Sequence, residues 1–320
     1  MAQEIPVYVF TGFMDSGKTS LIQETLFEND FAKDGDDKIL IISCEDGDEE
    51  YDVEKLKTIR ASVTTIEEEE DFNYDNLCKI QNEFKPDVVF IEYNGTWGID
   101  KLYDVDVKLP EGWVVAQSLA TVDSTTFDMY MTNMRAMMNE QLIKAEVVIF
   151  NRCTDETNKA KYRGMIKAIN RPAQIVYERA DGTIDDSPEE LPFDINADVI
   201  EISDADYALW FMDCMDSPKK YDGKKVHFLG LVYNPKESKF RKDVFVPGRF
   251  AMTCCVDDIQ FLGMKCKYDK ASTIEHKSWV DITARIKVEF AKEYKGKGPV
   301  LYPVSVEPAS QPDDELVYFS

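Results

Sequence analysis

The chain has 320 residues, and 44% of them are hydrophobic, which is enough for two domains with cores of their own. It carries 61 acidic against 37 basic residues, for a formal net charge of -24. Such a charge repels phosphate backbones and anionic lipid surfaces, so we expect no nucleic-acid partner and no direct membrane insertion. The seven cysteines are scattered along the chain, and we expect reduced thiols and a cytoplasmic location.

The first half of the chain alternates apolar runs with helical patterns. The apolar runs predict strands at 5–11, 38–43, 63–66, 86–92, 114–122, 146–150 and 173–177. The helical patterns predict helices at 18–31, 53–60, 72–84, 124–141 and 159–170. This alternation is typical of an α/β fold with a doubly wound, mostly parallel sheet.

The composition changes after residue 185. The stretch 186–222 is acidic and contains three prolines, which indicates a linker with a short helix near residues 207–212. Beyond it, strands are predicted at 225–233, 243–245, 250–256, 260–268, 279–290 and 300–307, with Gly and Pro between them. We therefore expect a small all-β domain at 223–320, shaped like a barrel.

The loop between the first strand and the first helix carries the pattern G-x-x-x-x-G-K-[ST] of a phosphate-binding loop (P-loop). Its glycines let the backbone turn tightly and bring N–H groups against phosphate oxygens. Lys18 is expected to reach the β- and γ-phosphates, and the Thr19 hydroxyl to hold Mg²⁺. The predicted nucleotide-binding residues of this loop are Gly12, Asp15, Ser16, Gly17, Lys18, Thr19 and Ser20.

A P-loop needs acidic residues at the ends of neighbouring strands to position Mg²⁺ and water. Glu92 ends a predicted buried strand and stands in the form E-x-x-G, with Gly95 expected near the γ-phosphate. Glu45 follows the strand at 38–43 and is expected to orient the attacking water or to contact a metal. With Lys18, these two carboxylates are the predicted catalytic residues, and Glu92 is a predicted Mg²⁺ ligand.

A base-recognition motif is expected after a later strand, and residues 151–155 read N-R-C-T-D there. In the guanine-reading motif N-K-x-D, the Asn braces the loops and the Asp accepts hydrogen bonds from guanine. Asn151 and Arg152 occupy the first two positions, whereas Asp155 stands one residue late and Thr154 takes its place. Asp155 reaches the base only if the loop bulges; otherwise the preference for guanine is weak.

These motifs resemble the CobW-type GTPases, which are relatives of the UreG and HypB metallochaperones. The matching segments, in the same order, are 11–19, 45–47, 86–95, 121–123, 141–151 and 169–176. The resemblance covers about residues 5–185 and implies a P-loop GTPase domain that uses GTP and Mg²⁺ and couples hydrolysis to the delivery of a metal, often zinc or cobalt. The C-x-C-C metal motif of that family has no counterpart in 59–65, which contains no cysteine.

The C-terminal part resembles the soluble domain of YcgQ-type permease subunits, through segments 228–233, 249–257 and 279–286. The resemblance implies a barrel of the oligonucleotide-binding (OB) type. Cys254 and Cys255 are candidate ligands for Zn²⁺, together with Cys266, Asp257 and one of the two histidines. Adjacent residues of a strand face opposite sides, so buried strand cysteines are the alternative interpretation.

Two functions remain open on the sequence. One is a slow GTPase that acts as a switch in metal or cofactor trafficking, with a metalloprotein as client. The other is a non-catalytic nucleotide-binding module whose β-domain docks a membrane permease or another partner. An ATP-using relative is a third reading, because the acid of the base motif is displaced.

Overall fold

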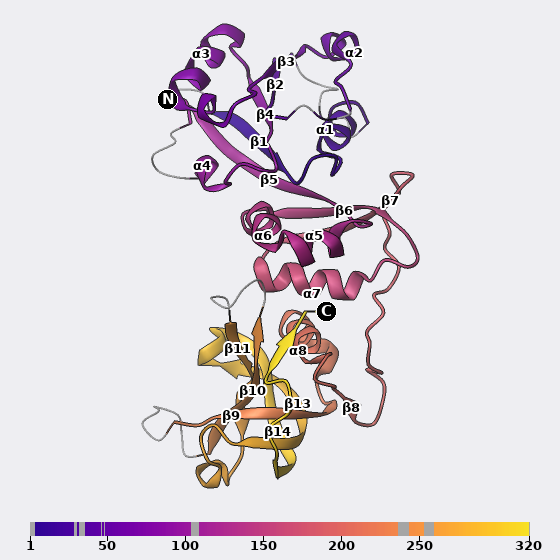
Figure 1. Cartoon of the computed structure of the whole chain (residues 1–320), viewed down its shortest axis with the longest axis vertical. Coiled ribbons are helices and arrows are strands. Elements are labelled where there is room, and N and C mark those ends of the chain that lie inside the picture. The colour runs from indigo at the N-terminus through magenta and orange to yellow at the C-terminus, as the bar shows by residue number, and fades with distance from the viewer. Residues whose placement is uncertain are drawn as a thin grey trace. The chain divides into compact units, whose positions relative to one another are not determined.

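The computed structural model describes residues 4–28, 31, 36–45, 47, 49–103, 109–235, 243–252 and 259–319. The chain forms two compact units. The first comprises Met1–Thr157 and Ile169–Ser187, and the second comprises Asn158–Ala168 and Pro188–Ser320. The second unit thus includes a helical segment that lies within the sequence of the first. Figure 1 traces the elements of each unit along the chain.

The first unit is built on a seven-stranded sheet with the order β3-β2-β4-β1-β5-β6-β7. The strands are β1 Ile5–Thr11, β2 Ile39–Ser43, β3 Ala61–Thr65, β4 Val88–Glu92, β5 Trp113–Asp123, β6 Val147–Cys153 and β7 Gln174–Arg179. Every pairing in this sheet is parallel. The predicted α/β class with a doubly wound sheet is confirmed, and the carboxyl ends of β1, β2 and β4 meet at one edge.

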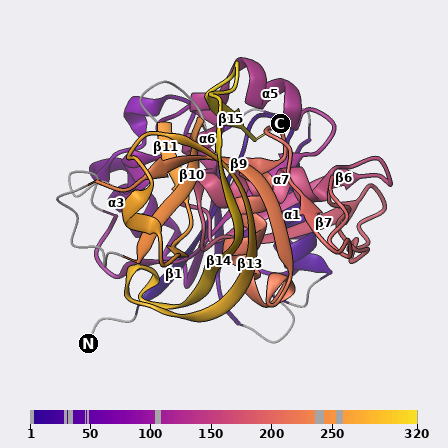
Figure 2. The ribbon, with the colours of Figure 1, turned by 90° about the horizontal axis from the view of Figure 1, so that it is seen from below.

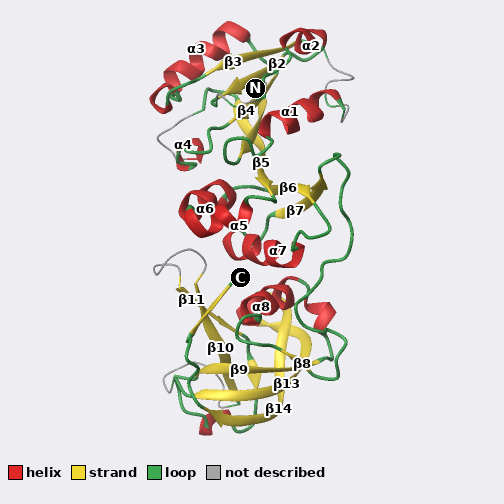
Figure 3. Cartoon of the chain, turned by 45° about the vertical axis from the view of Figure 1, so that its right-hand side comes forward, coloured by secondary structure: helices red, strands yellow, loops and turns green. Residues whose placement is uncertain are grey.

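Helices connect these strands, as Figure 3 shows in red. They are α1 Lys18–Phe27, α2 Val53–Thr58, α3 Tyr74–Phe84, α4 Asp100–Tyr103, α5 Phe127–Asn133, α6 Arg135–Ile143 and α7 Lys159–Ile169. The sequence predicts one helix at 124–141, but the structure has two, because Met134 leaves the helical region with φ -134° and ψ 36°. A short 3₁₀ turn, Glu69–Asp71, takes up the acidic run before α3.

The two faces of this sheet carry separate cores, because successive side chains of a strand point to opposite faces. Val7 and Val9 of β1 lie in one core with Ile91 of β4. Phe10 and Phe90, on the alternate positions of the same strands, lie in the other. All five residues of β2 and of β4 are buried, as expected for strands covered on both faces. These buried strands provide a rigid support for the residues at their carboxyl ends.

The second unit contains a mixed sheet of short and long strands. They are β8 Ile200–Glu201, β9 Lys225–Tyr233, β10 Val244–Met252, β11 Ile259–Gly263, β12 Cys266–Lys267, β13 Trp279–Ala291, β14 Gly296–Ala309 and β15 Leu316–Tyr318. The pairings β9–β10, β10–β12, β12–β14, β14–β13 and β13–β9 close a ring. Only β12–β14 is parallel in that ring, which is the strand order of an OB-type barrel. Figure 2 shows the long strands β13 and β14 running side by side in the barrel.

One strand of the barrel corrects the sequence analysis. Residues 243–245 and 250–256 were expected as two strands, whereas β10 runs through Pro247 and Gly248 without a break. Pro247 pairs with Val232 of β9, and Gly248 with Gly263 of β11. A Cβ on Gly248 would lie 2.5 Å from the backbone oxygen of Leu262, so glycine allows β11 to pass close to β10. Residues 253–256 lie outside the described residues.

The helix α8, Tyr207–Asp216, lies inside the second unit, within the stretch that the sequence analysis treats as a linker. Eight of its ten residues are buried, including Trp210. Asp213 is only 1% exposed and accepts hydrogen bonds from Arg163 of α7, from Lys220 at 2.8 Å and from Tyr221. Burial alone would raise the pKa of Asp213, but these hydrogen bonds and the charge of Arg163 hold it below its usual value. This charged network ties α7 to α8.

A second ionic cluster lies on the outer side of the barrel. His227 Nδ1 is 2.5 Å from Glu201 Oε2, and His227 Nε2 is 2.8 Å from Asp281 Oδ1. Partial burial lowers the pKa of His227, but the two carboxylates raise it more, so the pKa lies above its usual value. The cluster joins β8 to β9 and β13.

The negative charge is unevenly distributed along the sequence. Residues 1–187 hold 38 acidic and 19 basic residues, whereas residues 188–320 hold 23 and 18. The charge argument against anionic partners therefore applies mainly to the first unit. Among the described residues, no helix is both long and apolar enough to span a membrane.

Candidate functional site

The loop from β1 to α1 is shaped by residues with positive φ. Asp15 has φ 58°, and Gly17, the residue that precedes α1, has φ 97°. A Cβ on Gly17 would lie 2.5 Å from Asn151 Nδ2, so only glycine fits both the dihedral angle and the space. No side chain caps α1, which leaves the first N–H groups of the helix available to an anion.

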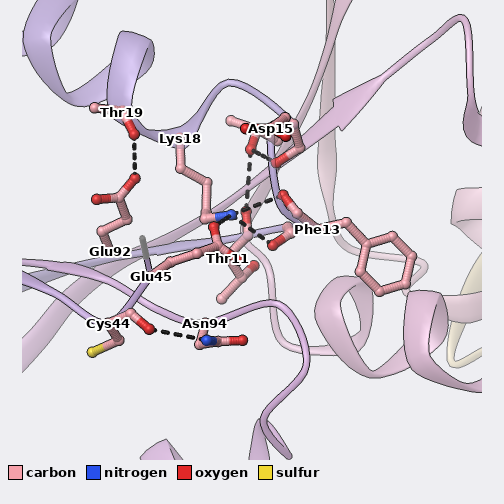
Figure 4. Close-up of polar contacts among 12 residues, drawn as sticks. Thr11, Phe13, Asp15, Lys18, Thr19, Cys44, Glu45, Glu92 and Asn94 are labelled. Atoms are coloured by element: carbon pink, nitrogen blue, oxygen red, sulfur yellow. Dashed lines mark hydrogen bonds and ion pairs between the residues drawn. The ribbon is translucent and has the colours of Figure 1, made fainter. Parts of the chain in front are cut away.

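Lys18 opens α1 and is almost fully buried, with 2% of its surface exposed. Its Nζ donates to the backbone oxygens of Gly12, at 2.9 Å, and Phe13, at 2.8 Å. The third partner is Glu45, whose Oε2 lies 2.5 Å from Nζ and whose side chain is 4% exposed. The structure therefore brings two of the three predicted catalytic residues into direct contact, as Figure 4 shows beside Glu92.

Glu92 ends β4 and accepts hydrogen bonds from three hydroxyl groups. Thr19 Oγ1 donates to Oε1 at 2.5 Å, while Ser43 Oγ and Tyr51 Oη lie 2.9 and 2.8 Å from Oε2. The carboxylate is 3% exposed, and both of its oxygens accept hydrogen bonds. The two predicted Mg²⁺ ligands, Thr19 and Glu92, are thus neighbours, held by β2 and by the segment before α2.

Gly95 packs directly against the P-loop. A Cβ at this position would lie 2.3 Å from the oxygen of Gly12 and 2.7 Å from Cα of Phe13. Its neighbour Asn94 donates from Nδ2 to the oxygen of Cys44 at 3.0 Å, which links the ends of β4 and β2. The E-x-x-G segment and the P-loop therefore form one continuous surface, with no room for a side chain between them.

A cavity of about 480 Å³ opens beside this surface. Its acidic lining residues are Glu45, Glu49, Glu50, Glu67 and Glu92. Burial, and then the charges of Glu92 and Glu45, raise the pKa of the Cys44 thiol, so Cys44 faces the cavity as a neutral thiol rather than as a thiolate. Ser20 also points to this side, because its Oγ lies 2.5 Å from Glu49 Oε2.

The base-recognition segment lies on the other side of the loop. Asn151 Nδ2 donates to the oxygen of Ser16 at 2.6 Å, so it braces the P-loop. Arg152 forms an ion pair of 2.6 Å with Asp123, at the end of β5. Partial burial raises the pKa of Asp123, but hydrogen bonds from Thr125 and Arg152 lower it more, so the pKa lies below its usual value. The structure brings the beginning of the N-R-C-T-D segment to the P-loop.

Asp155, the displaced acid of that segment, is engaged elsewhere. Its Oδ1 lies 2.8 Å from Arg179, which also pairs with Asp185. The Asp155 side chain is 88% exposed, and Arg152 contacts the oxygen of Asp15 instead, at 3.1 Å. In this conformation the carboxylate of Asp155 is committed to β7 rather than to the P-loop.

Three buried polar residues of the site were missed by sequence reasoning. Ser43 and Tyr51 donate hydrogen bonds to Glu92. Gln141 supports the P-loop, because its Oε1 accepts from the N–H of Gly12 at 3.4 Å and its backbone oxygen accepts from the hydroxyl of Thr11 at 3.0 Å. Ser43 could have been found, because it is a hydroxyl residue at the end of an apolar strand that leads to Glu45. Tyr51 and Gln141 carry no such local signal.

The predicted zinc site cannot be placed. Cys254, Cys255 and Asp257 lie outside the described residues, whereas Cys266 is fully buried in the barrel. Burial raises the pKa of the Cys266 thiol well above its usual value. Within the part of the chain that the structure describes, no group of three or more His, Cys, Asp or Glu side chains is arranged to hold a metal ion.

The chain is similar to several solved structures, at low identity. The Zn(II)-bound YjiA GTPase of E. coli is 19% identical, with a TM-score of 0.40 over 59% of this chain and 67% of that one. The hydrogenase maturation factor HypB of Archaeoglobus fulgidus is 18% identical, with a TM-score of 0.38 over 56% and 82%. The cell division protein MinD of Aquifex aeolicus is 18% identical, with a TM-score of 0.31 over 55% and 82%. No curated protein matches the chain.

Two family models match, and together they cover most of the sequence. Residues 179–319 match the DUF1980 C-terminal domain. Residues 6–177, more than half of the chain, match the CobW/HypB/UreG nucleotide-binding domain. These residues include the P-loop, Glu45, Glu92 and the segment from Asn151 to Asp155. The chain therefore belongs to the CobW/HypB/UreG family of P-loop nucleotide-binding proteins.

Proposed function

We propose that this protein binds GTP with Mg²⁺, hydrolyses it slowly and acts as a switch in metal or cofactor trafficking. The observation that carries the proposal is the pairing of a buried P-loop lysine with a hydroxyl–carboxylate pair. Lys18 and the N–H groups at the start of α1 would stabilise phosphate charge. Membership in a family of nucleotide-binding GTPases supports the same reading.

The residues present fit a magnesium ion. Thr19 Oγ1 and Glu92 Oε1 lie 2.5 Å apart, and Mg²⁺ prefers oxygen ligands of these two kinds. Thr19 and Glu92 would hold the ion, which would supply charge neutralisation at the phosphates. Ser43 and Tyr51 would keep Glu92 oriented during that task. Glu45 would be available to orient water once it no longer pairs with Lys18.

Slow turnover follows from the cavity beside the P-loop. None of the described residues that line it is an arginine, so Lys18 would act without an arginine from among them to stabilise the charge of the transition state. The choice of GTP rests on the family match, because Asp155, the base-reading acid of the motif, is paired with Arg179. Competition between GTP and ATP for the site tests this point, and equal affinities would refute the guanine assignment.

The experiment for the main proposal is phosphate release from GTP by the full chain and by Lys18→Ala. We expect turnover to fall by about two orders of magnitude in the variant, because a donor to the developing charge is lost. Circular dichroism and the thermal midpoint serve as controls for folding. Undiminished turnover in a folded Lys18→Ala protein would contradict the assignment.

The trafficking role is suggested by relatives whose descriptions name a zinc-bound GTPase and a hydrogenase maturation factor. Zn²⁺ is the metal we propose, and a metalloprotein is the client. Zinc stoichiometry in the full chain and in Cys254→Ser tests a site in the β-domain. An unchanged stoichiometry would remove that site from the proposal.

The second candidate is a non-catalytic module that binds nucleotide and docks a permease of the YcgQ type through its barrel. It is favoured by the separate match of residues 179–319 and by a cavity of about 610 Å³ on the barrel. The aromatic lining residues of that cavity are Tyr233, Phe250, Phe261 and Trp279. Tight GTP binding without turnover would favour this candidate. In either case we propose a cytoplasmic location.

A further inference from the structure

The ion pair between Lys18 and Glu45 uses the last free donor of the P-loop ammonium group. A lysine ammonium has three N–H donors. Two of them go to the backbone oxygens of Gly12 and Phe13, and the third faces Glu45 Oε2 at 2.5 Å. The two oxygens are neutral parts of the loop itself, so Glu45 is the one anionic partner of Lys18 among the described residues.

A phosphate oxygen and the Glu45 carboxylate would compete for the same donor. Two negative groups on one buried ammonium repel each other strongly, because little solvent screens them there. Lys18 is 2% exposed and the Glu45 side chain 4%, so the pair is shielded from water. A phosphate that binds Lys18 must therefore displace Glu45.

Glu45 is placed to be displaced, unlike the neighbouring carboxylate. Glu92 accepts from three hydroxyl groups and has both oxygens satisfied. Glu45 Oε1 is buried and has no hydrogen-bond partner among the described residues, so the contact with Lys18 is the one interaction that the described part of the chain gives this side chain. Glu45 also lines the cavity of about 480 Å³, which offers room for another rotamer.

We propose that Glu45 is an internal competitor of the nucleotide, which takes the place of a phosphate oxygen on Lys18 and is released when a nucleotide binds. This inference rests on the proposed function, because it requires that the P-loop binds a nucleoside triphosphate. The apparent affinity of the site for nucleotide is then the intrinsic affinity multiplied by the fraction of molecules in which Glu45 has left Lys18. Its release moves a carboxylate at the end of β2, so the acidic cavity changes with the nucleotide state.

The test compares the full chain with Glu45→Gln and Glu67→Gln. Glu67 lines the same cavity but is exposed and makes no ion pair with Lys18, so its variant removes the same charge without the contact. GTP affinity is measured by titration calorimetry at constant Mg²⁺ and salt. We expect Glu45→Gln to bind GTP about tenfold tighter, and Glu67→Gln to stay within about twofold of the native chain.

A second readout keeps the test decisive if Glu45→Gln is unstable. Without its partner, the buried charge of Lys18 lowers the thermal midpoint of the variant when no nucleotide is added. GTP should then raise the midpoint more in Glu45→Gln than in the native chain. Glu45→Asp, which is one methylene shorter, should show both effects in weaker form.

The outcomes separate the two proposals. Native protein that binds GTP, with equal or weaker binding in Glu45→Gln, overturns the competitor role and leaves the proposed function intact. Equal tightening in Glu45→Gln and Glu67→Gln also overturns it, because net charge alone then explains the effect. Absence of GTP binding in all three proteins overturns both proposals.

Discussion

Replacing Gly95 by alanine should disturb the P-loop directly. The added Cβ would lie 2.3 Å from the oxygen of Gly12 and 2.7 Å from Cα of Phe13. Both are backbone atoms, so no flexible side chain can yield. The oxygens of the same two residues hold the ammonium of Lys18, at 2.9 and 2.8 Å. A methyl group at this position therefore pushes on the atoms that orient the lysine.

The magnitude follows from the cost of overpacking, which is about 1–3 kcal/mol for a methylene forced into a packed site. In a domain of this size, that corresponds to a fall of roughly 2–10 °C in the thermal midpoint. If the loop shifts instead of the whole domain loosening, the same energy appears as about a tenfold or greater loss of nucleotide affinity. Either outcome, or a mixture, is measurable by thermal denaturation and by nucleotide titration.

Gly98 provides the matched control. It follows the same strand, and a Cβ built on it would meet nothing within 4 Å. Gly98→Ala should therefore leave both the thermal midpoint and the nucleotide affinity within error of the native chain. If Gly95→Ala behaves as Gly98→Ala does, then the close approach of the E-x-x-G segment to the P-loop is not a feature of the protein in solution.

Three further predictions concern groups held by hydrogen bonds. Tyr51→Phe removes one hydrogen-bond donor from Glu92, and the loss of a bond of about 1 kcal/mol should weaken the Mg²⁺ dependence of nucleotide binding about fivefold. Nucleotide binding measured without Mg²⁺ is the control and should not change. Asp213→Asn breaks a buried charge network and should lower the free energy of unfolding by about 3–5 kcal/mol in urea titrations, whereas Asp216→Asn, at a more exposed partner of the same network, should cost less than about 1 kcal/mol. The pKa of Asp213 is lowered in the folded state, so the stabilisation by its carboxylate is present above the unfolded pKa of about 3.9 and is lost as the pH falls through the folded-state pKa. The difference in unfolding free energy between the native chain and Asp213→Asn should therefore shrink below about pH 4. The pKa of His227 is raised in the folded state, so the stabilisation by its protonated ring is complete below about pH 6.5 and is lost as the pH rises through the folded-state pKa. A His227→Gln variant whose loss of unfolding free energy is the same at pH 6 and at pH 9 would contradict this.

Sequence reasoning predicts well those features that a short stretch of the chain carries. The G-x-x-x-x-G-K-[ST] pattern and the alternation of strands and helices are local, so the nucleotide-binding fold and the positions of Lys18, Thr19 and Glu92 were predicted directly. Parallel strands place their carboxyl ends at one edge, and that rule alone brings Glu92 and Glu45 near the loop. The prediction of one helix at 124–141 was wrong, because nothing in the local sequence marks the break at Met134.

Contacts between side chains that are far apart along the chain could not be predicted from the sequence. Whether Glu45 faces water or Lys18, and whether Asp155 faces a base or Arg179, depends on which charges the folded chain brings within a few ångströms. The donors of Glu92 come from residues that are far apart along the chain, so no spacing announces them.

The amino-acid sequence by itself determined that this chain carries a phosphate-binding loop on a parallel sheet and a β-rich C-terminal part, because those features are written in short patterns and in periodicity. Only the tertiary structure decided which C-terminal strands pair to close the expected barrel, that α8 packs within the second unit and that the P-loop lysine pairs with a carboxylate. Each of these depends on contacts between residues far apart in the chain, and the free energy of such contacts has no local signature.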